Sequence, residues 1–333
     1  MKKYNVAVVG ATGMVGNKFI RVLEERKLPV DNYYLYASER SQGKTISLFG
    51  KEHQVITLNE ENIIDKKIDF ALFSAGASIS GEYAPIFSRH GAIVVDNSSR
   101  WRTDPTVPLV VPEVNGESAL KNNGIIANPN CSTIQAVVAI KPLYDRFGIK
   151  RIIYSTYQAA SGAGVAGYND LKYGADGRAP VKFPYPIFGN VIPQIDVFTE
   201  SGYTKEEEKM IFETKKILND YELKVTATAV RVPVFHGHSE GINIEFVAPS
   251  TIDGIRSALS NAKGVVIVDD ISNGKYPMPI FAEDTDEVYV GRIRIDNTVN
   301  SGCNLWVVAD NIRKGAATNA VQIVEYLIKH KTA

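Results

Sequence analysis

The sequence predicts an α/β protein with two domains. A glycine-punctuated turn lies between a buried strand and a helix at the N-terminus, and strands then alternate with helices over the first part of the chain. The later part has a different pattern, in which strands cluster with occasional helices. The length of 333 residues is also long for a single hydrophobic core, which favours two domains.

The composition excludes several classes of protein. Basic and acidic side chains balance at 37 each, so there is no electrostatic reason to expect nucleic acid or a membrane surface as a partner. Two cysteines in so long a chain make no disulfide framework, which fits a reducing cytoplasm. The N-terminal apolar run is too short for a signal peptide, and no run approaches the roughly 20 residues of a membrane span. We therefore expect a cytoplasmic protein.

The first part of the chain predicts a doubly wound parallel sheet. Short apolar runs indicate buried strands, and segments of helical periodicity separate several of them. The expected strands are 4–9, 33–37, 68–74, 92–96 and 124–127, and the expected helices are 18–26 and 80–89.

The second part predicts a mixed or antiparallel sheet with few helices. Residues 160–193 are rich in glycine, proline and tyrosine and predict a long loop, which is usually a functional feature. Thr204 and Glu207 occupy capping-box positions at the start of a charged helix. The expected strands are 151–158, 224–231, 241–247, 264–269, 288–295 and 304–309, and the expected helices are 132–147, 204–219 and 313–330.

The N-terminal turn predicts a dinucleotide site. Residues 10–16 read GATGMVG, and this spacing lets the backbone approach a pyrophosphate at a helix N-terminus. After the next strand, Ser38, Arg40 and Ser41 could hold a 2′-phosphate, which favours NADP. Glu39 leaves NAD open, because an acidic residue at this place binds the ribose hydroxyl in NAD enzymes, and Arg40 could equally be a solvated surface charge.

Cys131 has the position of a reactive thiol. The segment NPNCST precedes an apolar helix, so Asn130 or Cys131 is expected at the N-cap. Unpaired backbone amides and the helix dipole there favour the thiolate, which is the nucleophilic form. The alternative is a buried structural cysteine, which is the interpretation we give to Cys303 before an apolar strand.

A thiol nucleophile usually needs a base, and two histidines are candidates. His236 and His238 lie in a turn expected between two strands, and the residues alone do not decide between them. Arg231 ends the preceding strand and could hold a carboxylate in a bidentate fork or form a strand-end salt bridge.

Three further charged residues are site candidates. Arg102 follows a strand, where ligand crevices form in open sheets. Glu206 and Lys209 share one face of a helix, although such pairs are often solvated ion pairs of small energetic value.

Several specific segments follow one another in order along nearly the whole chain: GATGMVG, VDNSSRWR, LVVPEVN, NPNCSTIQ, STYQAASGAG, PQIDVFTESGYTKEEEKMIFETKKI, RVPVFHGHSE, VGRIR and WVVADNIRKGAA. With these segments the chain resembles the bacterial aspartate-β-semialdehyde dehydrogenase family. The resemblance implies a Rossmann-type N-terminal domain at 1–130, completed by a C-terminal helix at 313–333, and a mixed α+β domain at 131–312 that carries catalysis and dimer contacts. Two positions depart from the family's pattern: Asn128, where the family often has cysteine, and Gly241, where it often has serine.

The resemblance also implies roles for individual residues. Cys131 corresponds to the nucleophile, His238 to the acid/base and Gln158 to the residue that orients the acyl intermediate. Arg231 and Glu206 correspond to binders of the substrate carboxylate and amine, and Arg102 and Lys209 to the phosphate binders. The cofactor contacts that it implies, with Gly10 added from the glycine loop, are Gly10, Thr12, Gly13, Met14, Val15, Ser161, Gly162 and Asn311. No metal is expected.

The implied activity is the reversible, NADPH-dependent reductive dephosphorylation of L-aspartyl phosphate, which releases inorganic phosphate and serves lysine, diaminopimelate, threonine and methionine synthesis. A homodimer is implied, and a tetramer stays open. Three alternatives remain: a reductase of N-acetylglutamyl phosphate, an acyl-CoA reductase and a non-catalytic dinucleotide-sensing module. An acidic residue placed to bind a free amine, Glu206, argues against an N-acetylated substrate.

Overall fold

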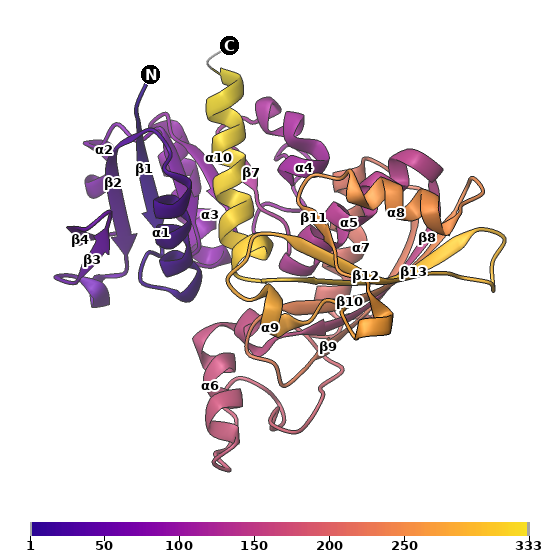
Figure 1. Cartoon of the computed structure of the whole chain (residues 1–333). Helices are drawn as coiled ribbons and strands as arrows, with labels where there is room; N and C mark the ends of the chain where they lie inside the picture. Colours follow the sequence, from indigo (N-terminus) through magenta and orange to yellow (C-terminus); the bar gives the residue numbers. More distant parts are fainter. Residues whose placement is uncertain (1, 332–333) are drawn as a thin grey trace. The chain divides into compact units, whose positions relative to one another are not determined.

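The computed structural model describes residues 2–331, which fall into two units (Figure 1). Unit 1 contains the chain up to Pro129 together with the segment that begins at Ala316. Unit 2 is Asn130–Gly315. Each unit has a sheet of its own.

Unit 1 is built on a seven-stranded sheet in the order β3-β4-β2-β1-β5-β6-β7. All neighbouring strands are parallel except β3 and β4, which form an antiparallel hairpin. The doubly wound parallel sheet expected from the sequence is thus confirmed. The strands are β1 (Tyr4–Val9), β2 (Val30–Ala37), β3 (Thr45–Leu48), β4 (Lys51–Thr57), β5 (Phe70–Phe73), β6 (Ile93–Asp96) and β7 (Ile125–Ala127).

The residue pattern does not predict the β3–β4 hairpin, because its turn has an unusual composition. The two strands are joined by Phe49 and Gly50, both with positive φ. Such a turn ordinarily carries Asn-Gly or Asp-Gly, because a bulky side chain is strained at positive φ. Because Phe49 is not a residue type that usually forms such turns, the residues give no signal for a hairpin here.

The helices of unit 1 include the one that closes the chain. The sequence predicts a helix over 313–330; instead, Arg313–Ala317 forms a π-helical turn and the α-helix begins at Thr318. Val321 and Leu327 of this last helix share a buried core with Phe19 and Leu23 of α1. Positions 332–333 of the implied C-terminal helix lie outside the described residues. The helices are α1 (Met14–Arg26), α2 (Glu61–Ile64), α3 (Ala77–Arg89), α4 (Pro112–Asn115) and α10 (Thr318–Lys331).

Unit 2 contains a six-stranded sheet in the order β11-β12-β13-β10-β8-β9. The pairs β8–β9 and β11–β12 are parallel and the others are antiparallel, so the sheet is mixed, as the sequence predicts. The strands are β8 (Ile149–Gln158), β9 (Lys224–Arg231), β10 (His238–Phe246), β11 (Val265–Ile267), β12 (Val288–Ile295) and β13 (Gly302–Ala309). The helices are α5 (Cys131–Phe147), α6 (Gly164–Gly174), α7 (Lys205–Leu218), α8 (Ile252–Ser260) and α9 (Pro279–Ala282).

The two faces of this sheet have different surroundings. Helices α5, α7 and α8 pack on one face (Figure 1). Side chains alternate between the faces of a strand, so His238, Glu240 and Ile242 of β10 are buried while Gly241 and Asn243 are partly exposed. We call the first the helix-covered face and the second the open face.

Two expectations for unit 2 are wrong. Residues 160–193 are not one long loop, because they contain a 3₁₀ turn (Ala160–Ala163) and α6. Only Gly167, Asp170 and Leu171 of α6 are buried, so the sequence carries no apolar periodicity to reveal it. His238 is also not a turn residue, since it begins β10 three residues before the strand expected at 241–247.

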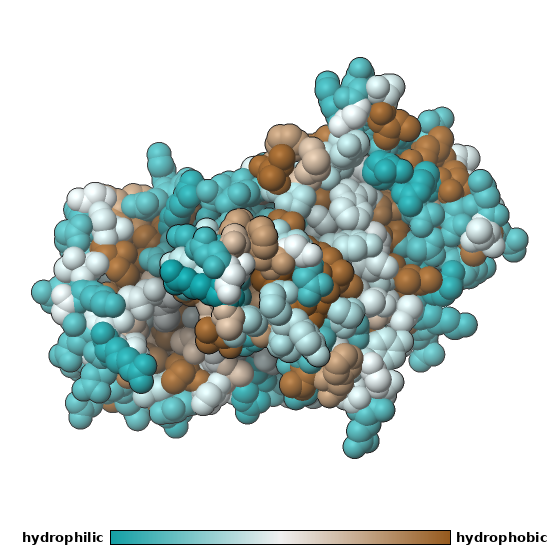
Figure 2. Space-filling model, turned by 90° about the horizontal axis from the view of Figure 1, so that it is seen from below, coloured by the Kyte–Doolittle hydropathy of each residue, from teal (hydrophilic) through white to brown (hydrophobic). Residues whose placement is uncertain are grey.

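The segment that follows α6 exposes several apolar side chains, including Val181, Tyr185 and Phe188. Helix α6 lies lowest in Figure 1 and therefore faces the viewer in Figure 2, which shows the molecule from below. Hydrophobic and hydrophilic residues are interspersed on the surface seen in Figure 2. The segment is anchored by Asp170, whose carboxylate accepts hydrogen bonds from three successive backbone amides at 181–183.

Two absences apply to the described part of the chain. None of its helices is both long and apolar enough to cross a membrane. Among the same residues, no group of three histidine, cysteine or acidic side chains is arranged to hold a metal ion.

Candidate active site

The start of α5 is built around Asn130. Its side-chain oxygen accepts hydrogen bonds from the backbone amides of Ser132 (3.0 Å) and Thr133 (3.2 Å), so Asn130 is the N-cap and Cys131 is the first helical residue. This decides between the two caps that the sequence leaves open. Cys131 is partly exposed, whereas Cys303 is fully buried in β13, as expected.

Glu206 binds three of the polar side chains around Cys131. Its Oε1 accepts hydrogen bonds from Asn130 Nδ2 (2.7 Å) and Gln158 Nε2 (3.1 Å), and its Oε2 pairs with Lys209 Nζ at 3.2 Å. Burial pushes the pKa of Glu206 upward, but the Lys209 ammonium and the two amides outweigh burial and hold the pKa below its ordinary value. Glu206 is therefore a buried carboxylate with its charge balanced.

Helix α7 supplies this carboxylate from a well-fixed start. The predicted capping box is present, with Thr204 and Glu207 bonded reciprocally through their side chains and backbone amides. Glu206, Lys209 and Glu213 then follow at spacings of three and four, which places them on one face. Glu213 Oε2 accepts the backbone amide of Asn130 at 2.6 Å, so α7 holds both the backbone and the side chain of the N-cap residue.

Three strands bring further side chains to one edge of the sheet. β8 and β9 are parallel and end at Gln158 and Arg231, which are register partners. β10 runs antiparallel to β8, so its first residue, His238, lies at the same edge. Ala159, just beyond β8, links two of them: its carbonyl accepts from Arg231 Nη1 (2.7 Å) and its amide donates to His238 Nδ1 (2.9 Å).

The bond from Ala159 determines where His238 carries its proton. Because Nδ1 accepts a backbone N–H, the neutral ring must carry its hydrogen on Nε2. Burial, followed by the positive charge of Arg231, lowers the pKa of His238 well below its ordinary value. In its resting form His238 is thus a neutral hydrogen-bond donor.

Arg231 is also positioned to act on the thiol. Burial lowers the pKa of Arg231, while attraction to Glu206 and to the Cys131 thiolate acts in the opposite direction. The guanidinium keeps its charge at any physiological pH and therefore favours the thiolate form of Cys131.

Ser161, Gly162 and Asn311 are also in unit 2. Ser161 and Asn311 are buried and bonded to each other, with Asn311 Nδ2 donating to Ser161 Oγ at 3.1 Å. A Cβ at Gly162 would lie 2.8 Å from Arg231 Nη1 and 3.3 Å from His238 Nε2. The absence of a side chain at Gly162 therefore leaves space beside both groups.

The glycine loop in unit 1 has the geometry of an anion-binding turn. Gly10 has φ 85°, and a Cβ there would lie 2.4 Å from Ser74 O, while a Cβ at Gly16 would lie 2.1 Å from Gly10 O. Helix α1 begins after Gly13, which offers no side-chain cap, so the first-turn amides of Met14 and Val15 are left for a bound anion. These residues fit the pyrophosphate of a dinucleotide.

The remaining predicted residues of unit 1 lie beyond its strands. Ser38, Arg40 and Ser41 follow β2; Ser38 and Arg40 are exposed, and Ser41 Oγ lies 3.4 Å from Thr12 Oγ1 in the glycine loop. Arg102 is buried and donates from Nη2 to the Asn97 carbonyl at 2.8 Å. The predicted residues thus form one group in unit 2 and another in unit 1.

Comparison with known proteins gives consistent matches over nearly the whole chain. Residues 5–122 match the NAD binding domain of semialdehyde dehydrogenases, and residues 140–314 match their dimerisation domain. The chain is 58% identical to the aspartate-semialdehyde dehydrogenase of Aquifex aeolicus, over 98% of each protein. The chain belongs to the aspartate-semialdehyde dehydrogenase family.

Solved structures of aspartate-semialdehyde dehydrogenases support the same assignment. A Vibrio cholerae aspartate-semialdehyde dehydrogenase II, complexed with ASA, shares 46% of its sequence with this chain, covers 99% of both chains and has a TM-score of 0.94. A Candida albicans aspartate-semialdehyde dehydrogenase with NADP is 27% identical, with 98% and 99% coverage and a TM-score of 0.77.

The two departures from the aspartate-semialdehyde dehydrogenase pattern have local roles. Asn128 is buried in unit 1, where its Nδ2 donates to Asn97 Oδ1 (2.8 Å) and its Oδ1 accepts from Asn319 Nδ2 (2.7 Å). Gly241 lies on the open face of the unit 2 sheet, where a Cβ would meet Ser155 only at ordinary contact distance. Neither departure alters a predicted site residue.

Three further residues belong to the group around Cys131 and are not predicted from the sequence. Glu213 could have been found from its spacing of seven from Glu206, which puts both on one face of α7. Glu240 could have been found from its spacing of two from His238 on a strand. Gly315 gives no signal, since its contact with Cys131 joins residues far apart in sequence.

Replacement of Gly315 by a larger residue should change the position of the Cys131 thiol. A Cβ at this position would lie 2.9 Å from Cys131 Cβ and 3.3 Å from its Cα, so Gly315→Ala must displace the first residue of α5. If Cys131 is the nucleophile, as the resemblance implies, kcat should fall about tenfold or more, because displacement of a reacting group by about 1 Å can have that effect. Gly241→Ala is the matched control, and equal steady-state rates for the two variants would contradict this reading of the contact.

Proposed function

We propose that the protein catalyses the reversible, NADPH-dependent conversion of L-aspartyl 4-phosphate to L-aspartate 4-semialdehyde and inorganic phosphate, through a thioester on Cys131. The observation that carries the proposal is the arrangement of Cys131 at the capped start of α5, with Arg231 and His238 at the adjoining sheet edge. The names of the similar enzymes, and the ASA in the Vibrio cholerae structure, support this substrate class. This activity would serve lysine, diaminopimelate, threonine and methionine synthesis.

The proposed chemistry begins with the Cys131 thiolate. Its sulfur forms a bond to the acyl carbon of the acyl phosphate, the carbon–oxygen bond to phosphate breaks, and the phosphate leaves with the bonding electrons and takes up a proton. Reduced nicotinamide, when bound, supplies the hydride that converts the thioester to the aldehyde level. Collapse of the resulting tetrahedral species releases the aldehyde and restores the thiolate.

His238 and Gln158 would act on the oxygen of the acyl group. The Nε2–H of neutral His238 can donate to the developing oxyanion, and the amide of Gln158 lies 3.5 Å from that nitrogen. For His238 to transfer a full proton as acid/base, Nδ1 must become protonated in the cycle, and its bond from Ala159 must then break.

The charged residues would bind the rest of the substrate. Arg231, held by the Ala159 carbonyl, is suited to a carboxylate, and Glu206 is suited to the substrate amine because it stays ionised. Lys209 offers an ammonium for phosphate, and its second contact, Asp196 at 2.8 Å, holds it in place. Arg102 of unit 1 is the other proposed phosphate binder.

Removal of the thiol tests the mechanism. Cys131→Ala should abolish phosphate-dependent reduction of NADP with aspartate semialdehyde, and His238→Asn should lower kcat by roughly 10² or more if this residue is the acid/base. Cys303→Ala, a change at the other cysteine, is the control and should keep its activity. Near-normal turnover of Cys131→Ala would refute covalent catalysis, and preference for N-acetylglutamyl phosphate or a CoA thioester would identify one of the alternative reductases.

We propose NADP as the cofactor on the basis of Arg40, which stands exposed on the turn after β2, between Ser38 and Ser41. The NADP in the Candida albicans enzyme is consistent with this choice.

The cofactor preference can be tested at one residue. Arg40→Ala should raise KM for NADP about tenfold, since a charged hydrogen bond to a phosphate is lost, and should leave KM for NAD nearly unchanged. Lys44→Ala, also exposed and nearby, is the control. Equal effects on both cofactors would mean that Arg40 does not bind the 2′-phosphate.

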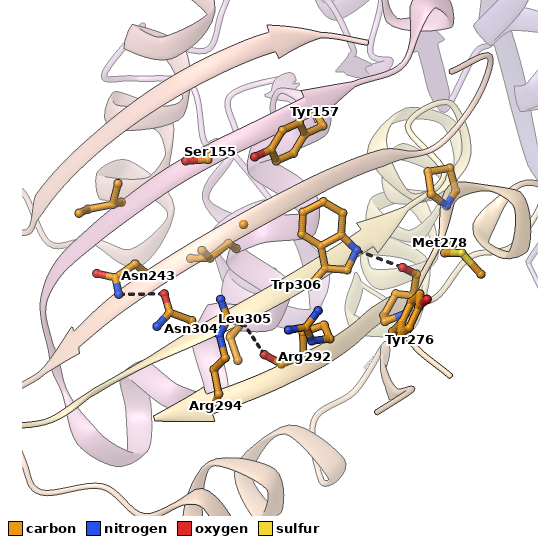
Figure 3. Close-up of a pocket in the computed structure, with 15 residues that line it drawn as sticks. Ser155, Tyr157, Asn243, Tyr276, Met278, Arg292, Arg294, Asn304, Leu305 and Trp306 are labelled. Atoms are coloured by element: carbon orange, nitrogen blue, oxygen red, sulfur yellow. Dashed lines mark hydrogen bonds between the residues drawn. The ribbon is translucent and has the colours of Figure 1, made fainter. Parts of the chain in front are cut away.

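We also propose that the protein is a homodimer that associates through the open face of the unit 2 sheet. The match to a dimerisation domain at residues 140–314 supports dimerisation, and the face holds a concave region of about 610 Å³ (Figure 3). Tyr157 and Trp306 lie there with ring centroids 5.5 Å apart, and Arg292 and Arg294 line the same hollow. Partly exposed aromatic side chains with arginine are typical of interfaces.

A charge placed in this hollow should separate the protomers. Trp306→Arg should shift the sedimentation coefficient from that of a dimer to that of a monomer, because an unpaired charge would be buried at the interface. Ile271→Arg places the same charge at an exposed turn and should remain dimeric. A dimeric Trp306→Arg variant would place the interface elsewhere.

A further inference from the structure

Glu240 is a buried acid that the proposed mechanism does not use. It lies on the helix-covered face of β10, two residues after His238, and is completely inaccessible to solvent. Among the described residues, neither of its carboxyl oxygens makes a hydrogen bond of good geometry, although Ser132 and Gln135 lie close enough to act on its pKa. A buried ionisable group without partners is costly, so its presence asks for a physical explanation.

The side chains next to Glu240 belong to α5, the helix that begins with Cys131. Its carboxyl group lies beside the side chains of Ser132 and Gln135, in the first turns of α5. In the described part of the chain, Ser132 Oγ and Gln135 Oε1 are themselves buried without partners. Gln135 Nε2 donates to the backbone carbonyl of His238 at 3.3 Å. The cluster therefore connects the residue after Cys131 with the strand that carries His238.

The protonation state of Glu240 decides whether this cluster can be satisfied. An ionised carboxylate only accepts hydrogen bonds, so it could not serve the acceptor Gln135 Oε1. A neutral carboxylic acid has one O–H donor and one free oxygen, so it can donate to Gln135 or Ser132 and accept from the Ser132 hydroxyl. The neutral form accounts for all the partnerless atoms of these three side chains with a single proton.

The electrostatic surroundings favour the same form. Burial raises the pKa of Glu240 well above its ordinary value, and the nearby Ser132 and Gln135 side chains only partly oppose this effect. Tyr154 on β8 is electrostatically coupled to Glu240, Cys131 on α5 precedes Ser132, and His238 lies two residues away on β10; none of these three groups is a cation in the resting site. Nothing in this set compensates a second negative charge beside the thiolate.

We propose that Glu240 is a positioning residue for the thiol chemistry: as a neutral acid, it shares its proton with Ser132 and Gln135 and so fixes the first turn of α5 against the start of β10. It touches neither substrate nor cofactor, and it acts through the placement of Cys131 relative to His238. This inference rests on the proposed role of Cys131 as the nucleophile.

The test compares two replacements of nearly the same size. Glu240→Gln keeps one donor and one acceptor without a charge, and Glu240→Leu keeps the volume but removes both. Glu222→Leu is the matched control, because Glu222 is an exposed glutamate of unit 2 that lies outside both the cluster and the hollow of the open face. Each variant is measured for Tm, for kcat and KM, and for the rate of Cys131 alkylation by iodoacetamide across pH.

We expect Glu240→Gln to resemble the unmodified protein, with kcat within about threefold and an unchanged alkylation profile. Glu240→Leu should lower kcat about tenfold or more with little change in KM, and should slow alkylation, because the thiol is misplaced rather than the substrate site lost. Near-normal kcat in Glu240→Leu would overturn the proposal, and so would a tenfold loss in a well-folded Glu240→Gln variant, since that loss would show that the charge is needed.

Two measurements keep the outcomes separable. If Glu240→Leu does not fold, Gln135→Leu removes the link to the His238 carbonyl and should show the same fall in kcat with unchanged KM; normal kcat there would also overturn the proposal. Alkylation reports on Cys131 whatever the substrate is. Full activity of Cys131→Ala would therefore refute the proposed function, whereas alkylation that is insensitive to Glu240→Leu would refute only the positioning role.

Discussion

The hydrogen bonds made by Asn130 fix the geometry on which the rest of unit 2 depends. Its side-chain oxygen caps α5 while its side-chain nitrogen binds Glu206, and its backbone amide is held by Glu213. These bonds connect α5, the helix that begins with Cys131, directly to α7 without involving the sheet. Because Glu206 also binds Gln158, the same carboxylate connects the helix start to the sheet edge.

Because side chains alternate along β10, the strand presents one set of residues to the helix-covered face and another set to the open face. Residues that face α5, among them His238 and Glu240, lie in a dry interior where hydrogen bonds and charges have large effects. Residues one position away, such as Gly241 and Asn243, lie on the open face, where the dimer interface is proposed. A shift of one residue in the register of β10 would exchange these sets. The register is held by antiparallel pairing to β13 over 238–245 and to β8 over 239–245, and the pairing with β8 shifts only after Glu245.

The sequence was sufficient for features with local causes. The glycine turn, the capping box at Thr204 and the helix that follows Cys131 all depend on residues close together in the chain, and all are present. It was insufficient where the signal is weak or distant. Helix α6 buries too few side chains to show a period, and Phe49 occupies a turn position that normally carries a small polar residue. The contact of Gly315 with Cys131 arises only when the chain folds back.

Glu206 and Glu240, two of the buried glutamates near the thiol, illustrate how environment assigns different protonation states to one residue type. Glu206 has an ammonium and two amides around it, so its pKa is lowered and it remains a carboxylate. Glu240 has a hydroxyl and an amide but no cation, so burial dominates and its pKa rises. If Glu240 were also ionised, no cation among the groups that act on its pKa would offset its charge, whereas Glu206 has Lys209 and Arg231. A neutral Glu240 adds no negative charge beside Cys131, and this is the state that suits the proposed role of Cys131 as a thiolate nucleophile.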